Sequence, residues 1–395
     1  MSSKRIPWPV GLNFFLLFSA NAVMAPFLQI FLKRQGFSAS EIGILLGIYE
    51  LVGVAGPLVM GRLADRTRHY RLFLFLCITG ALAAFLPMEW VSGMGPMFPL
   101  IAVLGWCYRS CIPLQDSLAG RLLEDPTRQY GKVRIMGSIS YILLLSFFSL
   151  SGVLGGSATK PILVAFSVCA VATALSVPLL PRVTAERAAS ASREEKGNLK
   201  DFDASFWTVI FLIFLARFGM SAHYSFFSLY LQQQLGVGDA VGFVWAIGSI
   251  VEMPILWFSG ALIRRFGIRA LLLASLLAVC LRLAIYGLFP SLPVVLAAQV
   301  LHAFTLGVLL SVSVAFVNRK VRDRNRGLGM AIYQAVGIGL AAFLGSSIGG
   351  YIVERSGFSS LFLGYAVPPL AGAVLLLLSW KRLDGTVAAR DGTGL

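Results

Sequence analysis

Twelve apolar stretches of about 20 residues or more, separated by short polar segments, dominate this sequence. A helix of about 20 apolar residues spans a hydrocarbon core of about 30 Å. Open strands cannot cross lipid, and the stretches lack the alternation of a barrel strand, so we expect an all-α membrane protein with twelve transmembrane helices. The stretches lie near 9–32, 41–61, 72–90, 96–119, 133–155, 160–180, 206–233, 240–263, 270–289, 293–317, 327–352 and 358–380.

Composition supports a chain that crosses the membrane many times. Hydrophobic residues make up 57% of the sequence and charged residues 13%, with a mean hydropathy of +0.80. A soluble domain is about 25% charged, so this chain has too few ionic side chains for a water-facing surface. The first stretch resembles a signal peptide but runs on to Leu32, so we expect it to stay as the first helix.

The basic residues predict the orientation of the chain. If both termini lie inside, the cytoplasmic segments hold 26 of the 33 lysines and arginines, and the outer loops hold four. This asymmetry predicts a multi-pass protein of the cell (inner or plasma) membrane with both termini in the cytoplasm. The net charge of +15 comes from short clusters between helices rather than from a basic domain, so we expect no nucleic-acid partner.

The two halves of the chain resemble each other. One segment and three single positions correspond at an offset of 199 residues: Phe31-Leu32-Lys33-Arg34-Gln35 with Tyr230-Leu231-Gln232-Gln233-Gln234, Gly43 with Gly242, Gly61 with Gly260, and Arg66 with Arg265. We therefore predict a six-helix bundle over 1–181, a charged cytoplasmic linker over 182–205, and a second bundle with a short tail over 206–395. Parallel six-helix repeats are one known transporter plan, with the substrate site between the halves at mid-depth.

The loop after the second stretch carries a motif. It reads Gly61-Arg-Leu-Ala-Asp65-Arg66, followed by Arg68 and Arg71, and it resembles the signature of the major facilitator superfamily. In that family the glycine lets helices approach closely, and the aspartate caps a neighbouring helix and pairs with arginine. The resemblance implies a gating or structural role for Gly61, Asp65, Arg66 and Arg71; plain positive-inside charge is the alternative.

Within that superfamily, the chain is most similar to the phenylpropionate permease group, relatives of lactose permease. Pro113-Leu114-Gln115-Asp116-Ser117-Leu118, Tyr130-Gly131-Lys132-Val133-Arg134 and Gln299-Val300-Leu301-His302 carry this similarity. The resemblance implies the two-bundle fold, a small-molecule substrate and a monomer in the lipid bilayer.

Ionisable residues deep in a membrane helix cost about 2.5 kcal/mol or more each, so they are functional candidates. Six of them fall near mid-depth, on the predicted helices 2, 4, 7, 8, 9 and 10: Glu50, Arg109, Arg217, Glu252, Arg282 and His302.

Three of these repeat an arrangement of lactose permease, in which a Glu, an Arg and a His on helices 8, 9 and 10 carry the coupled proton. The resemblance implies proton coupling by Glu252, Arg282 and His302. A mobile arginine can exchange with a proton as the partner of a desolvated carboxyl. This sequence lacks the second acidic residue that lactose permease has on helix 10. A static ion pair of Glu252 with Arg282 is the alternative.

Glu50 and Arg109 have opposite charges at similar depth, so we expect them to pair. They then either line a substrate cavity or only join two helices. Asp116 lies lower on the same face as Arg109, and we expect it to form an inner-gate or structural salt bridge with Arg134 or Lys132 rather than to touch substrate.

Further substrate-binding candidates are Arg217, Tyr224 and Asn21. Arg217 and Tyr224 are seven residues apart and share a helix face. His223, beside them, departs from the phenylpropionate relatives, in which a histidine falls where Met220 stands. A lone histidine on an aromatic helix is more often a packing residue, and we assign it no role.

Counting the mid-depth charges suggests an anionic substrate. Two carboxylates face three guanidiniums, and buried charges need partners, so a substrate carboxylate can balance the third cation. We therefore predict a proton-coupled symporter of a small organic carboxylate, with an aromatic carboxylate as one candidate, working by alternating access. A sugar or nucleoside symporter and a metabolite or drug exporter remain alternatives.

The sequence lacks the residue patterns that enzymatic catalysis, metal binding or nucleotide binding would need. The sequence shows no nucleotide-binding loop, metal cluster or Ser-His-Asp spacing, so we expect no enzyme, no metal and no cofactor, with the proton gradient as energy source. The five cysteines all fall in apolar stretches, where small apolar packing is the expected role.

Overall fold

A computed structural model describes residues 8–181 and 198–380, and no strand occurs among them. Ten continuous helical stretches there are long and apolar enough to cross a membrane. Two of them, Gly238–Leu288 and Arg326–Leu378, contain 51 and 53 residues and break at Gly267 (φ 76°) and Gly357 (φ 78°). Because each is long enough to cross twice and breaks where the sequence predicts a loop, the described part of the chain contains the twelve expected segments.

The chain divides into two compact units. Unit 1 comprises Met1–Ser192 with Leu231–Ala246, and unit 2 comprises Arg193–Tyr230 with Ile247–Leu395. The domain boundaries expected from sequence, 1–181 and 206–395, stay a prediction. Most of the predicted linker, 182–197, lies outside the described residues.

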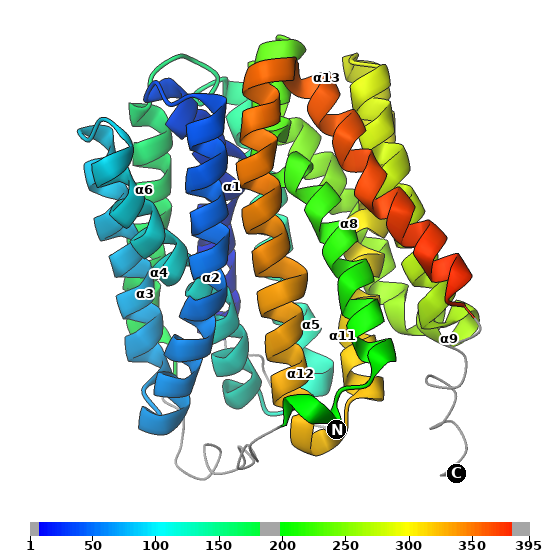
Figure 1. The fold of residues 1–395 in the computed structure, drawn as a ribbon. Helices are drawn as coiled ribbons and strands as arrows, with labels where there is room; N and C mark the ends of the chain where they lie inside the picture. Colours follow the sequence, from blue (N-terminus) through cyan, green and yellow to red (C-terminus); the bar gives the residue numbers. More distant parts are fainter. Residues whose placement is uncertain (1–7, 182–197, 381–395) are drawn as a thin grey trace. The chain divides into compact units, whose positions relative to one another are not determined.

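Unit 1 contains six long helices. In it α1 packs on α5 and α6, and α4 packs on α2 and α3. A capping box begins α2: the Ser38 hydroxyl accepts from the Glu41 amide, and the Glu41 carboxylate accepts from the Ser38 amide. The helices are α1 (Trp8–Arg34), α2 (Ala39–Thr67), α3 (Tyr70–Phe85), α4 (Met94–Leu122), α5 (Pro126–Ser151) and α6 (Lys160–Ser176) (Figure 1). Two short segments continue α3 and α6, η1 (Leu86–Glu89) and η2 (Val177–Leu179). Unit 1 also includes η4 (Tyr230–Gln234) from its second residue on, and η5 (Gly238–Ala240).

Unit 2 has less regular helices. α8 packs along α13, and two segments have the wider π-helical turn, η7 (Ala303–Val308) and η9 (Tyr333–Leu340). Such turns are frequent at functional sites. The other elements are η3 (Leu199–Asp201), α8 (Ala204–Leu229), α9 (Val241–Leu288), α10 (Leu292–Ala298), η6 (Gln299–Leu301), α11 (Leu309–Lys320), η8 (Asp323–Asn325), α12 (Arg326–Ile332) and α13 (Ala341–Leu378).

Each unit joins two of its helices through a buried pair of serine hydroxyls. Ser19 of α1 lies 2.9 Å from Ser140 of α5, and Ser225 of α8 lies 2.6 Å from Ser346 of α13. Small polar side chains of this kind let membrane helices pack closely and hydrogen-bond without water.

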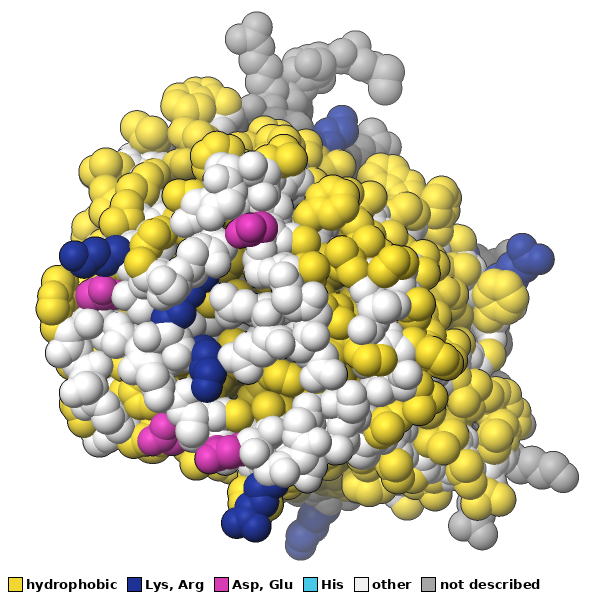
Figure 2. Space-filling view, turned by 90° about the horizontal axis from the view of Figure 1, so that it is seen from above, with side chains coloured by type: hydrophobic (Ala, Val, Ile, Leu, Met, Phe, Trp, Pro, Cys, Tyr) yellow, Lys and Arg dark blue, Asp and Glu magenta, His cyan; other side chains and the backbone are white. Residues whose placement is uncertain are grey.

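Large apolar side chains cover much of the outer surface. Leu150, Trp257 and Leu378 are among the most exposed. Seen from above in Figure 2, hydrophobic side chains also cover much of the surface, with scattered Lys, Arg, Asp and Glu side chains among them and among other groups. A lipid environment accounts for this pattern, because the polytopic chain meets hydrocarbon where a soluble protein meets water.

Candidate functional site

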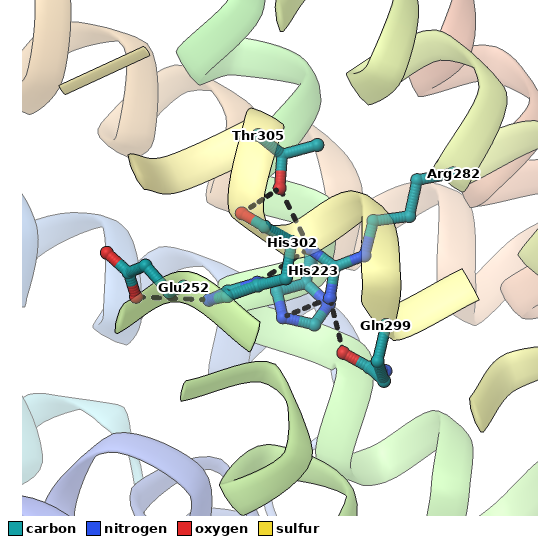
Figure 3. A network of polar contacts seen from close by, with 6 residues as sticks. All are labelled: His223, Glu252, Arg282, Gln299, His302 and Thr305. Atoms are coloured by element: carbon teal, nitrogen blue, oxygen red, sulfur yellow. Dashed lines mark hydrogen bonds and ion pairs between the residues drawn. The ribbon is translucent and has the colours of Figure 1, made fainter. Parts of the chain in front are cut away.

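Arg282, on the second part of α9, is the centre of a polar cluster in unit 2. Its side chain is fully buried, and its guanidinium has five N–H donors and no acceptor. Five acceptors surround it, so every donor has a partner, and Figure 3 draws four of the five, all but Tyr286. They are the Tyr286 hydroxyl on Nε (2.8 Å), His302 Nδ1 and Thr305 Oγ1 on Nη1 (2.8 and 3.0 Å), and Gln299 Oε1 and His223 Nε2 on Nη2 (2.7 and 3.4 Å).

His302 stands between Arg282 and Glu252. Because arginine can only donate, Nδ1 of His302 must accept, and the ring proton of the neutral imidazole is then on Nε2. That nitrogen lies 3.7 Å from the Glu252 carboxylate. The three predicted residues therefore form a chain in the order Glu252, His302, Arg282.

This order differs from the direct Glu252–Arg282 ion pair that the sequence left open. Among the residues that the structure describes, no carboxylate lies within ion-pair distance of Arg282. Oxygen and nitrogen dipoles solvate the guanidinium instead. The Glu252 carboxylate is linked to Arg282 through His302, and the imidazole of His302 can itself bind a proton.

Helical spacing and glycine bring these side chains together. Gln299, His302 and Thr305 are three residues apart and lie on one side of the chain, where η6 gives way to η7. A Cβ added at Gly307 would lie 3.2 Å from Glu252 Cγ, and one at Gly248 would lie 3.3 Å from Gln299 Oε1. The two glycines thus let the first part of α9 approach the segment that carries His302.

Unit 1 holds the other predicted pair. Arg109 Nη2 of α4 lies 2.7 Å from Glu50 Oε2 of α2, and the two side chains are 38% and 22% exposed. The Arg109 guanidinium also lies 5.9 Å from the centre of the Tyr49 ring. The structure thus joins the two residues in a direct ion pair, and it leaves both partly accessible.

The C-terminal end of α2 carries the predicted motif. Asp65 accepts hydrogen bonds from the Tyr70 hydroxyl and from Arg121 Nη2 (2.9 Å). Arg71 donates to the Pro178 carbonyl at 2.5 Å, whereas Arg66 is exposed. Within unit 1, a Cβ added at Gly61 meets no atom within 4 Å, so close approach of helices is not the role of this glycine there.

Asp116 lies where the sequence predicts an inner salt bridge. It accepts from the Tyr130 hydroxyl at 2.8 Å and lies 4.0 Å from Arg134 Nε, at the limit of an ion pair. The Arg134 guanidinium stacks 4.0 Å above the centre of the Phe18 ring. The structure therefore brings Asp116 to Arg134 on α5.

The remaining candidates lie outside both clusters. Arg217, half-buried on α8, makes no hydrogen bond or ion pair with the described residues, and its Nε is buried. Asn21, half-buried on α1, likewise has no hydrogen bond to the part of the chain that the structure describes. Tyr224 packs edge-on against His223, with ring centres 5.5 Å apart.

Sequence reasoning gave no role to His223, Tyr286, Gln299 and Thr305, which complete the Arg282 cluster. A signal for three of them existed. A buried guanidinium needs five acceptors, and polar residues one helical turn from Arg282 or from His302 are the nearest supply. His223 comes from a different helix, and no spacing indicates it.

Metal-binding groups do not gather in the described chain. No three His, Cys, Asp or Glu side chains among residues 8–181 and 198–380 lie close enough to hold a metal ion.

Comparison with known proteins identifies relatives along the whole chain. The family model described as "MFS_1 like family" matches residues 8–364. Maltose permease of Geobacillus stearothermophilus is 29% identical over 376 residues, which cover 94% of each chain. A probable 3-phenylpropionic acid transporter of Escherichia coli (strain K12) is 25% identical, covering 88% of this chain and 91% of that protein. A solved variant of the nucleoside transporter NupG superposes with a TM-score of 0.84 at 17% identity, covering 95% of this chain and all of that one (100%).

Proposed function

Because this chain belongs to the MFS_1 like family of membrane transporters, we propose that it moves a small organic solute across the membrane together with a proton, by alternating access. It is a transporter rather than an enzyme, as are the relatives that it resembles. One observation carries the proton coupling: His302 lies between the Glu252 carboxylate and a fully buried guanidinium.

The charge balance of this cluster explains why a proton can drive it. With Glu252 ionised and His302 neutral, the negative charge of Glu252 and the positive charge of Arg282 cancel. One added proton leaves the cluster with a net positive charge in a buried site, which is costly unless the surroundings rearrange. A ligand shifts a conformational equilibrium by its differential affinity for the two states, and here the proton is that ligand.

A carboxylate is the first candidate for the solute. In the structure Glu50 matches Arg109, and Glu252 reaches Arg282 through His302, so the surplus positive charge falls on Arg217. The buried Nε of Arg217 has no hydrogen-bond acceptor among the described residues. A substrate carboxylate suits this guanidinium, because charge-assisted hydrogen bonds between the two groups are strong. The 3-phenylpropionic acid transporter among the relatives supports this choice.

A neutral sugar is the second candidate, favoured by the Glu50–Arg109 pair. The pair is internally neutral and partly exposed, so it offers both acceptors and donors to hydroxyl groups without adding charge. The relative named maltose permease supports this candidate.

The solute classes are separated by ligand-dependent melting of the purified protein, with 3-phenylpropionate, its amide, maltose and a nucleoside as probes. A ligand at 100 times its dissociation constant stabilises the folded state by about 2.7 kcal/mol. We expect the acid to raise the melting temperature and the amide to have no effect. A response to maltose alone contradicts the carboxylate and favours the Glu50–Arg109 pair.

Proton coupling is tested in proteoliposomes with the solute that passes this assay. Glu252→Gln should abolish accumulation driven by a pH gradient and retain solute exchange, because the amide cannot release a proton. Glu354→Gln is the matched control, the same substitution in unit 2 away from the cluster, and should accumulate solute normally. Unchanged accumulation by Glu252→Gln contradicts the assignment of Glu252 to proton coupling. If the pH gradient drives solute out of the proteoliposomes instead, the proposed direction of transport, uptake, is contradicted.

Orientation and assembly are part of the same proposal. The charge asymmetry of the loops supports cytoplasmic termini, and the resembled family supports a monomer. Reporter fusions at the two ends should report the cytoplasm, and light scattering in detergent should give the mass of one chain. A periplasmic reporter signal or a stable dimer contradicts this part.

A further inference from the structure

The chain has three histidines, and two of them contact the same guanidinium. His69 is exposed at the inner end of α3, whereas His223 and His302 are both buried. His223 Nε2 lies 3.4 Å from Arg282 Nη2, and His302 Nδ1 lies 2.8 Å from Nη1. The centres of the two rings are 5.9 Å apart, so Arg282 bridges a pair of imidazoles (Figure 3).

The tautomers of both rings follow from this contact. Arginine only donates, so each imidazole nitrogen that faces it must accept. Neutral His223 therefore carries its proton on Nδ1, and neutral His302 carries its proton on Nε2. Each ring can take a second proton only at the nitrogen that Arg282 occupies, and hence only after Arg282 withdraws from it.

The guanidinium is arranged so that it can release one ring at a time. Nη1 has Thr305 as a second acceptor, and Nη2 has Gln299. Loss of either imidazole thus leaves an oxygen acceptor on the same nitrogen. Because one hydrogen bond is lost rather than all five, the release costs far less than removal of the arginine.

We propose that His223 is a second proton-binding ring of the coupling site, which takes a proton on Nε2 when Arg282 withdraws from it. The proton comes from water, forms an N–H bond on Nε2 and leaves from the same nitrogen when Arg282 returns. This inference rests on the proposed proton coupling, and it adds a residue that sequence reasoning treated as packing.

The groups around His223 are compatible with a ring that changes its charge. From α9 it faces Arg282 and Tyr286, whose ring centre lies 6.1 Å away, and from the segment before η7 it faces His302, with Glu252 beyond. On its own helix Tyr224 and Phe227 pack against it. From α13 the nearby polar groups are Ser346, bonded to Ser225, and Tyr365, bonded to the Gly345 carbonyl. Arg282 is thus the cation that a protonated His223 must displace.

The direct test uses nitrogen NMR of the protein labelled with ¹⁵N-histidine. His69→Gln leaves the two buried rings, and His302→Gln in that background assigns the remaining signal to His223. We expect His223 as the Nδ1–H tautomer at high pH, and conversion to the doubly protonated ring as the pH is lowered over the range in which the protein stays folded. A His223 that stays neutral throughout, or that shows the Nε2–H tautomer, overturns the proposal.

Transport gives a second test with a conservative variant. His223→Gln keeps an amide acceptor for Arg282 but cannot bind a proton. We expect the pH dependence of solute accumulation in His223→Gln to show one titrating group fewer than in the unaltered protein. His69→Gln should keep the normal profile. A His223→Gln protein with the normal profile overturns the proposal, and His223→Asn repeats the test if the glutamine does not fit.

The failures of the two proposals differ. If the unaltered protein accumulates no solute in response to a pH gradient, the proposed function fails. If it does accumulate solute and His223 never binds a proton, the present inference alone fails.

Discussion

Each unit places an arginine in its membrane-spanning part, and the surroundings of the two arginines differ. Arg109 in unit 1 forms a direct ion pair with Glu50, 2.7 Å away, and is 38% exposed. Arg282 in unit 2 is fully buried among five neutral acceptors and meets its carboxylate through His302.

This difference predicts that the two arginine sites differ in how they respond to solute and to protons. A direct and partly solvated ion pair is open to a solute. A guanidinium held by imidazole, amide and hydroxyl groups depends on the protonation of its neighbours, because a protonated imidazole cannot accept from it. We therefore expect the Glu50–Arg109 pair of unit 1 to respond to solute rather than to protons, and the Arg282 cluster of unit 2 to respond mainly to protons.

The largest effect should come from removing each arginine. Arg282→Met leaves Glu252 uncompensated and several buried acceptors without donors, so it should lower the free energy of unfolding by about 3–5 kcal/mol. Arg109→Met removes a partly exposed pair and should cost about 1 kcal/mol or less. Unfolding of both variants in mixed micelles measures the difference. Equal losses contradict the contrast between the two sites.

A smaller effect should follow from Gly105, one turn before Arg109 on α4. A Cβ there would lie 2.5 Å from the Tyr49 carbonyl oxygen, and backbone cannot move aside as a side chain can. Gly105→Ala should therefore push α2 from α4, cost about 1–3 kcal/mol and weaken the Glu50–Arg109 pair. Thermal melting checks the stability. Gly120→Ala is the control, because a Cβ at Gly120 meets nothing within 4 Å; equal melting of the two variants contradicts the account.

Two glycines allow a milder comparison of function. A Cβ at Gly53 would lie 2.6 Å from Arg109 Cγ, and one at Gly307 would lie 3.2 Å from Glu252 Cγ. Both neighbours are flexible side chains that can shift, so each alanine should change transport by a few-fold, about 1 kcal/mol or less. Gly53→Ala should weaken solute affinity, and Gly307→Ala should reduce accumulation driven by the pH gradient. If Gly53→Ala instead reduces accumulation driven by the pH gradient and Gly307→Ala weakens solute affinity, the roles assigned to the Glu50–Arg109 pair and to the Arg282 cluster are reversed.

The smallest effect concerns Asp201 in η3, next to the start of α8. Hydrogen bonds from Asn325 and Arg324 hold the pKa of Asp201 below its ordinary value. A lowered carboxyl pKa contributes stability above the unfolded value of about 3.9, and this contribution is lost as the pH falls through the folded value. The unaltered protein should therefore lose its stability advantage over Asp201→Asn on acidification below about pH 4. Melting curves of the two proteins that stay parallel down to acid pH contradict this.

Hydropathy predicted the spanning segments because lipid leaves a chain few other choices. The loops expected after 240–263 and 327–352 correspond to the breaks at Gly267 and Gly357. Depth along a helix also identified Glu50, Arg109, Glu252, Arg282 and His302, since charge at mid-depth is rare.

Contacts across helices could not be predicted in the same way. Depth does not fix the rotation of a helix, so the sequence left open whether Arg282 meets Glu252 directly. The place of His302 between them depends on the π-helical turn that begins at Ala303 and on the close approach at Gly307. His223 was missed because its partner lies 59 residues away on another helix.

The most direct measurement of proton coupling is the pH of a lightly buffered medium while solute enters proteoliposomes down its own gradient. The account predicts that the medium becomes more alkaline with the unaltered protein and with Glu50→Gln wherever the latter still transports. It predicts no pH change with Glu252→Gln, although that variant still exchanges solute. Solute entry without a pH change in the unaltered protein, or a normal pH change with Glu252→Gln, contradicts the account.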